Sequence, residues 1–306
     1  MGLLKMLAQL RSPFWDGVVS AITLLGEETF FMLVGLFAFW CLSKKWGYRF
    51  MIIGLSGSVI NQLLKAIFLI PRPWVLDPSF TIVESAREAA TGYSFPSGHT
   101  QSAANVFGTL AAWIGKKWVT VLCIVLIALV GFSRMYLGVH TPLDVGVSFV
   151  TGAITVLGFV YLFNRAEGHN RRKILIGLIA LVLALALLGY VSFAPVTERN
   201  IAEFDAHGVE NAWKLLGTIS GMLLAWWVDE RHTHFDIKAV WWAQICKLVI
   251  GLALVMGVRL GMKPVLNAIF PCAAFTGAIR YFLMAAVGGV LWPMTFGFWG
   301  RLGRKA

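Results

Sequence analysis

Charged residues are scarce in this chain. Of its 306 residues only 13% are Asp, Glu, Lys or Arg, whereas 58% are hydrophobic, and the mean hydropathy is +0.75. So few charged side chains cannot cover the surface of a soluble protein of this length. The composition therefore excludes an ordinary soluble domain and predicts an integral-membrane protein that crosses the bilayer several times.

The chain also has little cysteine and lacks the paired ligand spacing that is typical of metal sites. Its four cysteines stand alone in the sequence, at Cys41, Cys123, Cys246 and Cys272. A zinc site or a disulfide framework normally shows closely spaced ligands such as CxxC. We therefore expect no metal and no disulfide. His232 and His234 lie among charged residues, and we interpret them as solvated loop residues.

Long hydrophobic runs recur from one end of the chain to the other. Backbone groups inside lipid must be hydrogen-bonded within the protein, so each run is expected to be helical and the fold class all-α, a polytopic transmembrane helical bundle. After a first crossing near residues 27–42, the runs predict crossings at 48–70, 98–115, 118–135, 141–163, 173–193, 212–228, 240–260 and 275–299. These make about nine crossings, a core of about six helices followed by about three more.

The N-terminal region does not form a clear crossing of its own. Residues 1–25 have a helical pattern of apolar positions interrupted by Pro13, typical of an amphipathic surface helix or of a lead-in to the first crossing. The run at 29–42 is shorter than the roughly 20 residues that a crossing needs. The first crossing must therefore include residues before Glu27 and Glu28, or begin with this acidic pair at the interface. We expect three regions, 1–25, 26–193 and 194–306.

Positive charge is distributed over short loops rather than gathered in one patch. The formal net charge is +11, and loops at 44–49, 116–117, 165–173, 231–238 and 301–305 are rich in Lys and Arg. Such loops normally face the cytoplasm, which places the N-terminus outside and the C-terminus inside. The same distribution accounts for the charge without a nucleic-acid partner. We expect the inner membrane of a bacterium, or the endoplasmic reticulum of a eukaryote.

Three polar stretches interrupt the apolar pattern, and this topology places all of them on the outer face. They contain Lys65 and Arg72, then the turn from Tyr93 to His99, and finally Arg134, His140 and Asp144. Cations, imidazoles and a glycine-containing turn on one face indicate phosphate chemistry. His99 and His140 lack a third metal ligand at usable spacing, and their cationic neighbours favour an anion.

The turn Pro96-Ser97-Gly98-His99 opens a predicted helix. Proline suits the first turn of a helix, and glycine lets an anion approach the backbone closely. The free N–H groups and the helix dipole would then bind a phosphate, with the Ser97 hydroxyl as a further donor. The alternative is an ordinary helix start with a hydrogen-bonded histidine.

The other two stretches also allow a functional and a structural interpretation. Lys65 lies near the end of a predicted helix, and Arg72 lies between Pro71 and Pro73 in the segment that follows it. Their side chains either converge on one anion or are a lysine that extends to the membrane surface and an arginine of a loop. The spacing of His140 and Asp144 predicts one helix face, where the carboxylate would orient the imidazole; the alternative is a capping aspartate. Arg134 has the fork geometry for phosphate oxygens.

Together, Lys65-x6-Arg72-Pro73, Pro96-Ser97-Gly98-His99 and Ser133-Arg134-x5-His140-x3-Asp144 resemble the three-part signature of the type-2 phosphatidic acid phosphatase superfamily. The resemblance implies a metal-independent phosphatase without cofactors that acts on a lipid phosphate or diphosphate outside the cytoplasm, through a phosphohistidine. His140 would be the nucleophile, Asp144 its orienting partner and His99 the general acid. The phosphate-binding residues would be Lys65, Arg72, Ser97, Gly98 and Arg134.

Two features go beyond the signature itself. With the extra helices after residue 193, the number of crossings resembles that of the sphingosine-phosphate phosphatase and glucose-6-phosphatase branches. These helices would enclose the substrate, pack against the core, or form a homo-oligomer through Gly257 and Gly261. We also expect headgroup contacts from Glu27, Glu28, Trp74 and Tyr93. Alternative functions are a phosphotransferase with the same phosphate-binding residues and, less favoured, a transporter.

Overall fold

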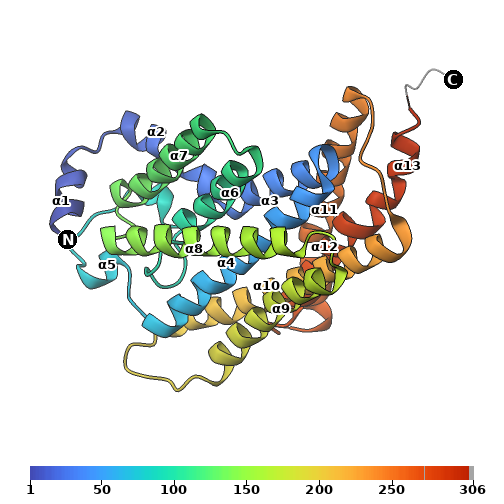
Figure 1. Cartoon of the computed structure of the whole chain (residues 1–306). Coiled ribbons are helices and arrows are strands. Elements are labelled where there is room, and N and C mark those ends of the chain that lie inside the picture. The colour runs from blue at the N-terminus through green and yellow to red at the C-terminus, as the bar shows by residue number, and fades with distance from the viewer. Residues whose placement is uncertain (272, 303–306) are drawn as a thin grey trace.

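The structure is a computed structural model that describes residues 1–271 and 273–302, so Cys272, Arg304 and Lys305 lie outside it. All regular secondary structure within these ranges is helical, which confirms the all-α prediction (Figure 1). The helices are α1 Gly2–Gln9, α2 Pro13–Thr23, α3 Glu28–Phe37, α4 Lys44–Phe68, α5 Pro73–Leu76, α6 Gly98–Ile114, α7 Lys117–Tyr136, α8 Pro142–Ala166, α9 Asn170–Phe193, α10 Ala202–Val228, α11 Trp241–Ile269, α12 Thr276–Ala286 and α13 Phe296–Trp299.

Six helical segments within the described ranges are long and apolar enough to cross a membrane. They are Lys44–Leu76, Lys117–Tyr136, Pro142–Ala166, Arg171–Phe193, Trp241–Ile269 and Thr276–Trp299. A seventh crossing results if Pro13–Gly26 and Glu28–Leu42 act as one span bent by 51°. The predicted crossings at 98–115 and 212–228 are helical, as α6 and the second half of α10, so the count of nine stays a prediction.

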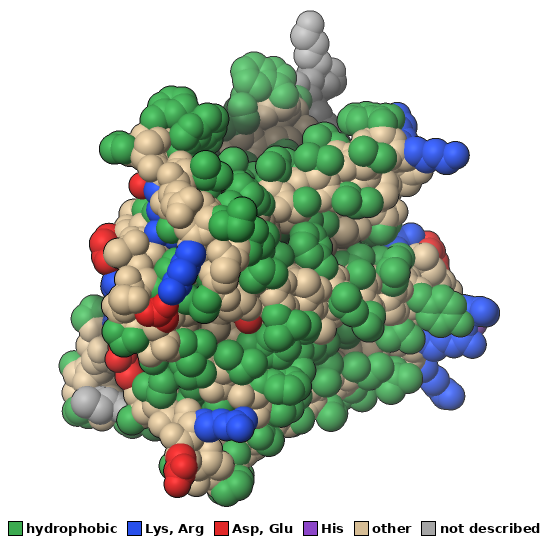
Figure 2. All heavy atoms as spheres, turned by 90° about the vertical axis from the view of Figure 1, so that its left-hand side faces the viewer, with side chains coloured by type: hydrophobic (Ala, Val, Ile, Leu, Met, Phe, Trp, Pro, Cys, Tyr) green, Lys and Arg blue, Asp and Glu red, His purple; other side chains and the backbone are tan. Residues whose placement is uncertain are grey.

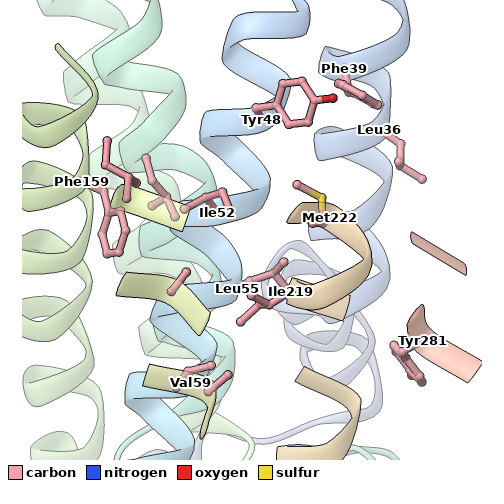
Figure 3. Packing of buried hydrophobic residues seen from close by; sticks show 14 of the residues in the cluster. Leu36, Phe39, Tyr48, Ile52, Leu55, Val59, Phe159, Ile219, Met222 and Tyr281 are labelled. Atoms are coloured by element: carbon pink, nitrogen blue, oxygen red, sulfur yellow. The ribbon is translucent and has the colours of Figure 1, made fainter. Parts of the chain in front are cut away.

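Helix α4 lies at the centre of the bundle because apolar residues surround most of its length. Its side chains Ile52, Leu55 and Val59 are buried in one hydrophobic cluster with residues of α8 and α10. Figure 3 shows this packing, with Phe159 on one side of α4 and Ile219 on the other. The helices after residue 193 therefore share a hydrophobic core with the earlier ones instead of forming a separate unit.

The N-terminal region packs over the loops at one end of the bundle. Leu4 of α1 and Val19 of α2 are buried in a cluster with Leu137 and Val139. The Ser12 hydroxyl caps α2, and Pro13 occupies its first turn, so this proline begins a helix and does not interrupt one. The chain bends at Glu27, between α2 and α3. A first crossing formed by Pro13–Leu42 would include residues on both sides of Glu27 and Glu28.

The outer surface is largely apolar, as a bilayer requires. Figure 2 shows hydrophobic side chains over much of one face, with charged side chains mainly toward its edges. Large exposed side chains include Leu157 of α8, Val182 of α9 and Val249 of α11, each about 60% or more exposed. These helices present apolar residues outward along their middle sections, which is the pattern of a multi-pass membrane protein.

Candidate active site

The polar residues of the three stretches lie together at one end of the bundle. The end of α4, the end of α7 and the start of α8 lie on the same side of the molecule, at the left in Figure 1. The side chains of Lys65, Arg72, Ser97, Arg134, His140 and Asp144 are all buried. So many charged groups are buried only when they serve one another or a ligand.

His140 and Asp144 are in contact, but not because they share a helix face. Helix α8 begins at Pro142, so His140 precedes it and the predicted shared face is wrong. The contact forms because the Asp144 carboxylate turns back over the helix start, where its Oδ2 accepts hydrogen bonds from the Thr141 N–H at 2.8 Å and from His140 Nδ1 at 3.3 Å. Asp144 is therefore a capping residue and an imidazole partner at once, and its catalytic role stays a prediction.

Ser94 completes this group, although its role was not predicted from the sequence. Its hydroxyl donates to Asp144 Oδ2 at 2.5 Å and lies 3.4 Å from His140 Nδ1. The only signal for it in the sequence is a hydroxyl side chain within the Tyr93–His99 turn. The Asp144 carboxylate thus accepts three hydrogen bonds, from the Ser94 hydroxyl, the Thr141 N–H and His140 Nδ1, and these hold it in place.

Arg72 faces the other nitrogen of His140. Its Nη1 donates to His140 Nε2 at 2.8 Å, while its Nε and Nη2 donate to the carbonyls of Gly92 and Thr91. This arrangement fits the neutral imidazole with its proton on Nδ1 and a lone pair on Nε2. Burial, followed by the positive charges of Arg72 and Lys65, lowers the pKa of His140 well below its ordinary value. His140 is therefore neutral at neutral pH.

Two further cations complete the wall around His140 and His99. Lys65 Nζ donates to the carbonyls of Tyr93 and, at 3.3 Å, Ser94. Arg134 Nη1 donates to Thr23 Oγ1 at 2.9 Å, whereas its Nε and Nη2 are buried and make no hydrogen bond within the described residues. His99 Nε2 is also buried without a partner there. Buried donors of this kind fit an anionic ligand better than an apolar one.

Two helices begin at this site with their N-terminal ends toward it. Ser97 caps α6, and Thr141 caps α8. The Ser97 N–H donates to the Asp144 carbonyl at 3.1 Å, which ties the two starts together. A Cβ built on Gly98 would find only Asn61 Oδ1 nearby, at 3.7 Å, so no protein atom crowds that position. The dipoles and free N–H groups of both helices favour a bound phosphate.

The residues expected to contact the lipid headgroup, Glu27, Glu28, Trp74 and Tyr93, differ from one another in their surroundings. Trp74 lies under two guanidinium groups, with its ring 5.8 Å from that of Arg72 and 5.4 Å from that of Arg87. Glu27 is half-buried and Glu28 exposed, and neither carboxylate forms a hydrogen bond or ion pair within the part of the chain that the structure describes. A headgroup contact by any of them stays a prediction.

Tyr93 links the phosphate-binding turn to α10. Its hydroxyl donates to Asp205 Oδ1 at 2.8 Å and accepts from the Ile201 N–H at 2.9 Å, and its ring packs edge-on against Phe204. Burial, with the Asp205 carboxylate as a lesser cause, raises the pKa of Tyr93 to about 12, so the hydroxyl keeps its proton. The same residue offers its carbonyl to Lys65, so α10 helps to position that lysine.

Replacing Tyr93 with Phe is therefore expected to lower kcat/KM for phosphate release by up to about thirtyfold, because two hydrogen bonds that hold the turn to α10 are lost at roughly 1 kcal/mol each. Asp205→Ala should act similarly, whereas Asp205→Asn keeps an acceptor oxygen and should stay near the wild type. Tyr161→Phe, at an exposed position, is the matched control. Equal activity of the Tyr93→Phe and wild-type proteins would show that this link does not position the site.

No group of three or more His, Cys, Asp or Glu side chains is placed to hold a metal ion within residues 1–271 and 273–302. Cys41, Cys123 and Cys246 are free cysteines. Metal independence itself stays a prediction, to be tested by chelation. What the site does offer is a concentration of buried cations around two imidazoles.

Two family models match this chain. Residues 44–168 match the PAP2 superfamily, and residues 213–303 match the transmembrane extension of PAP2 superfamily phosphatases. The first match contains the residues from Lys65 to Asp144. The second covers the second half of α10 and the helices after it.

Curated proteins with similar sequences are phosphatases by name. A probable sphingosine-1-phosphate phosphatase of Dictyostelium discoideum is 27% identical over 72% of this chain and 56% of its own. In Bacillus subtilis, phosphatidylglycerophosphatase B is 31% identical (47% of this chain, 73% of its own), and the undecaprenyl-diphosphatase BcrC is 34% identical (36% and 53%). This chain thus spans little more than half of the first and last of these proteins. No solved structure matches it.

Proposed function

Because this chain belongs to the PAP2 superfamily, we propose that it is an integral-membrane phosphohydrolase that removes phosphate from a lipid phosphate or lipid diphosphate. The observation that carries the proposal is the environment of His140. Asp144 and Ser94 lie against its Nδ1 and Arg72 lies against its Nε2, which leaves Nε2 as the nitrogen that faces the phosphate-binding cations.

The reaction begins when Nε2 of neutral His140 attacks the phosphorus. Arg72 turns from Nε2 to a phosphoryl oxygen, and a phosphohistidine forms as the bond to the lipid oxygen breaks. Asp144 stabilises the positive charge that develops on the imidazole. His99 gives its proton to the leaving oxygen, and the negative charge of the bound phosphate favours the protonated form of His99. Water then attacks the phosphohistidine, with His99 taking its proton.

The phosphate-binding residues supply the charge that phosphoryl transfer requires. Lys65, Arg72 and Arg134 provide fixed cations, and the starts of α6 and α8 provide N–H groups around Gly98. Positioning and charge neutralisation account for most of the catalysis of such reactions. We propose that these groups act without a metal ion, on the extracytoplasmic face.

A phosphate-release panel tests this function. The purified protein in detergent with EDTA would be given phosphatidate, phosphatidylglycerol phosphate, sphingosine 1-phosphate and undecaprenyl diphosphate. We expect release from at least one of them, and inhibition by vanadate. Complete loss of activity in EDTA would contradict the metal-independent mechanism. Phosphate transfer that depends on an added lipid or glycan acceptor would instead favour the phosphotransferase.

The pH profile of kcat/KM offers a separate test. The attacking form of His140 is the neutral one, and its pKa lies below the ordinary 6.5, so the acid limb of the profile is expected below pH 6.5. Since His99 must be protonated with substrate bound, kcat, which reports the substrate complex, should fall at higher pH as His99 loses its proton. Arg72→Gln removes a charge that lowers the pKa of His140, so its residual activity should show an acid limb at higher pH. An unmoved limb would mean that the limb reports another group.

A further inference from the structure

A cavity lies beside the phosphate site, between the end of α4 and the segment that connects α9 to α10. Its volume is about 370 Å³. Residues 68–71 form one wall, and Glu198, Arg199 and Ile201 form the other. The first wall is apolar, whereas the second carries one negative and one positive side chain next to an apolar one.

Three of the residues that form this cavity are linked through their backbone to the phosphate site. Pro71 directly precedes Arg72, and the Ile70 carbonyl accepts a hydrogen bond from the Ser94 N–H at 2.8 Å. On the opposite wall, the Ile201 N–H donates to the Tyr93 hydroxyl at 2.9 Å. Both walls of the cavity are therefore linked, through the backbone and these two hydrogen bonds, to the turn that precedes the phosphate-binding residues.

Exposed apolar side chains lie on the chain segments next to both walls of the cavity. Ile67 and Phe68, at the end of α4, are each 45% exposed. Phe193 at the end of α9 and Val196 in the connection are 88% and 85% exposed, which is unusual for large apolar side chains outside a membrane. A lipid chain that leaves the cavity over these residues would pass into the bilayer without crossing a polar surface.

We propose that this cavity is the subsite for the part of the lipid substrate that adjoins its phosphate, and that residues 198–201 select among lipid phosphates. The first carbons of the chain lie against Phe68–Pro71 and Ile201. Hydroxyl or amino groups near the phosphate lie between Glu198 and Arg199, which offer an acceptor and a donor. The inference rests on the proposed phosphohydrolase function and assigns to the connection between α9 and α10 a part in substrate choice.

Filling the cavity should separate lipid from soluble substrates. Ile201→Trp keeps the backbone N–H that Tyr93 accepts but occupies the space for the chain. We expect kcat/KM for the best lipid of phosphatidate, sphingosine 1-phosphate and undecaprenyl diphosphate to fall by about tenfold or more, in the range that pocket shape provides. Para-nitrophenyl phosphate, which has no chain, should be hydrolysed within about twofold of the wild-type rate. Ile174→Trp, at an exposed position of α9, is the matched control.

A second variant tests the polar wall without adding volume. Arg199→Gln removes the charge of an exposed side chain and should change the order of preference among the three lipids, with para-nitrophenyl phosphate unaffected. Equal losses for lipid and soluble substrates, or no change in either variant, would overturn the subsite. If the wild-type protein releases phosphate neither from these compounds nor from phosphatidylglycerol phosphate, the proposed function itself fails. Thermal unfolding of each variant shows whether Ile201→Trp folds; if it does not, the Arg199→Gln result decides.

Discussion

His140→Ala is expected to lower kcat for lipid phosphate hydrolysis by about 10⁴- to 10⁶-fold, the range seen when a covalent nucleophile is removed. No other imidazole can replace it, because His140 is the one whose Nδ1 faces Asp144 and whose Nε2 faces Arg72. Substrate binding should persist, since the cations and both helix starts remain. The measurement is phosphate release by the purified variant, together with its affinity for vanadate.

A labelled substrate sharpens this test. Rapid acid-free quenching of the wild-type protein with ³²P-labelled lipid phosphate should leave label on the protein, and His140→Ala should carry none. His232→Ala, which changes an exposed histidine in the helical turn Asp229–Thr233 after α10, is the matched control and should behave as the wild type. Robust turnover by His140→Ala would rule out the phosphohistidine.

Arg134→Gln should produce the second large effect, a loss of about 10²- to 10³-fold in kcat/KM. Arg134 is fully buried, and within the described residues its Nε and Nη2 have no partner, so its charge and two donors are available to a phosphoryl group. Glutamine is polar but shorter than arginine and carries no charge. Arg134→Lys restores the charge without the planar fork and should recover only part of the loss.

The distribution of the loss between kcat and KM identifies what Arg134 does. If it stabilises the transition state, kcat falls most; if it only binds the phosphate, KM rises with little change in kcat. Arg171→Gln, at an exposed position of α9, controls for the loss of one positive charge. Unchanged kinetics with Arg134→Gln would mean that this arginine supports the fold through Thr23 and takes no part in catalysis.

The fold class followed from composition because a bilayer leaves few choices. Apolar runs in lipid must be helical, so every predicted crossing after the first is helical in the structure, although α10 begins ten residues before its predicted start and α11 ends nine residues beyond its predicted end. The number of crossings does not follow in the same way. Helix α6 has 17 residues and α10 carries charged residues in its first turns, so neither length nor hydropathy shows whether they cross.

The residues of the site were predicted better than their geometry. Chemistry and resemblance indicate His140 and Asp144. Their spacing of four residues predicts a shared helix face, whereas in the structure Asp144 caps the helix start and His140 precedes it. The partners that come from distant parts of the chain left no local signal. Thr23 reaches Arg134 across 111 residues, and Asp205 reaches Tyr93 across 112, and only the packed bundle brings them together.

The bend of the first crossing has a consequence for the lipid environment. At the bend, a Cβ built on Gly26 would lie 2.7 Å from the carbonyl oxygen of His99 and 2.9 Å from Val130, so the backbones touch with no room for a side chain. A transmembrane segment adjusts its tilt when the bilayer is thicker or thinner than its apolar length. A change in the tilt of Pro13–Leu42 would therefore move Gly26 toward or away from the start of α6. We expect the rate of proton transfer by His99 to vary with the acyl-chain length of the surrounding bilayer.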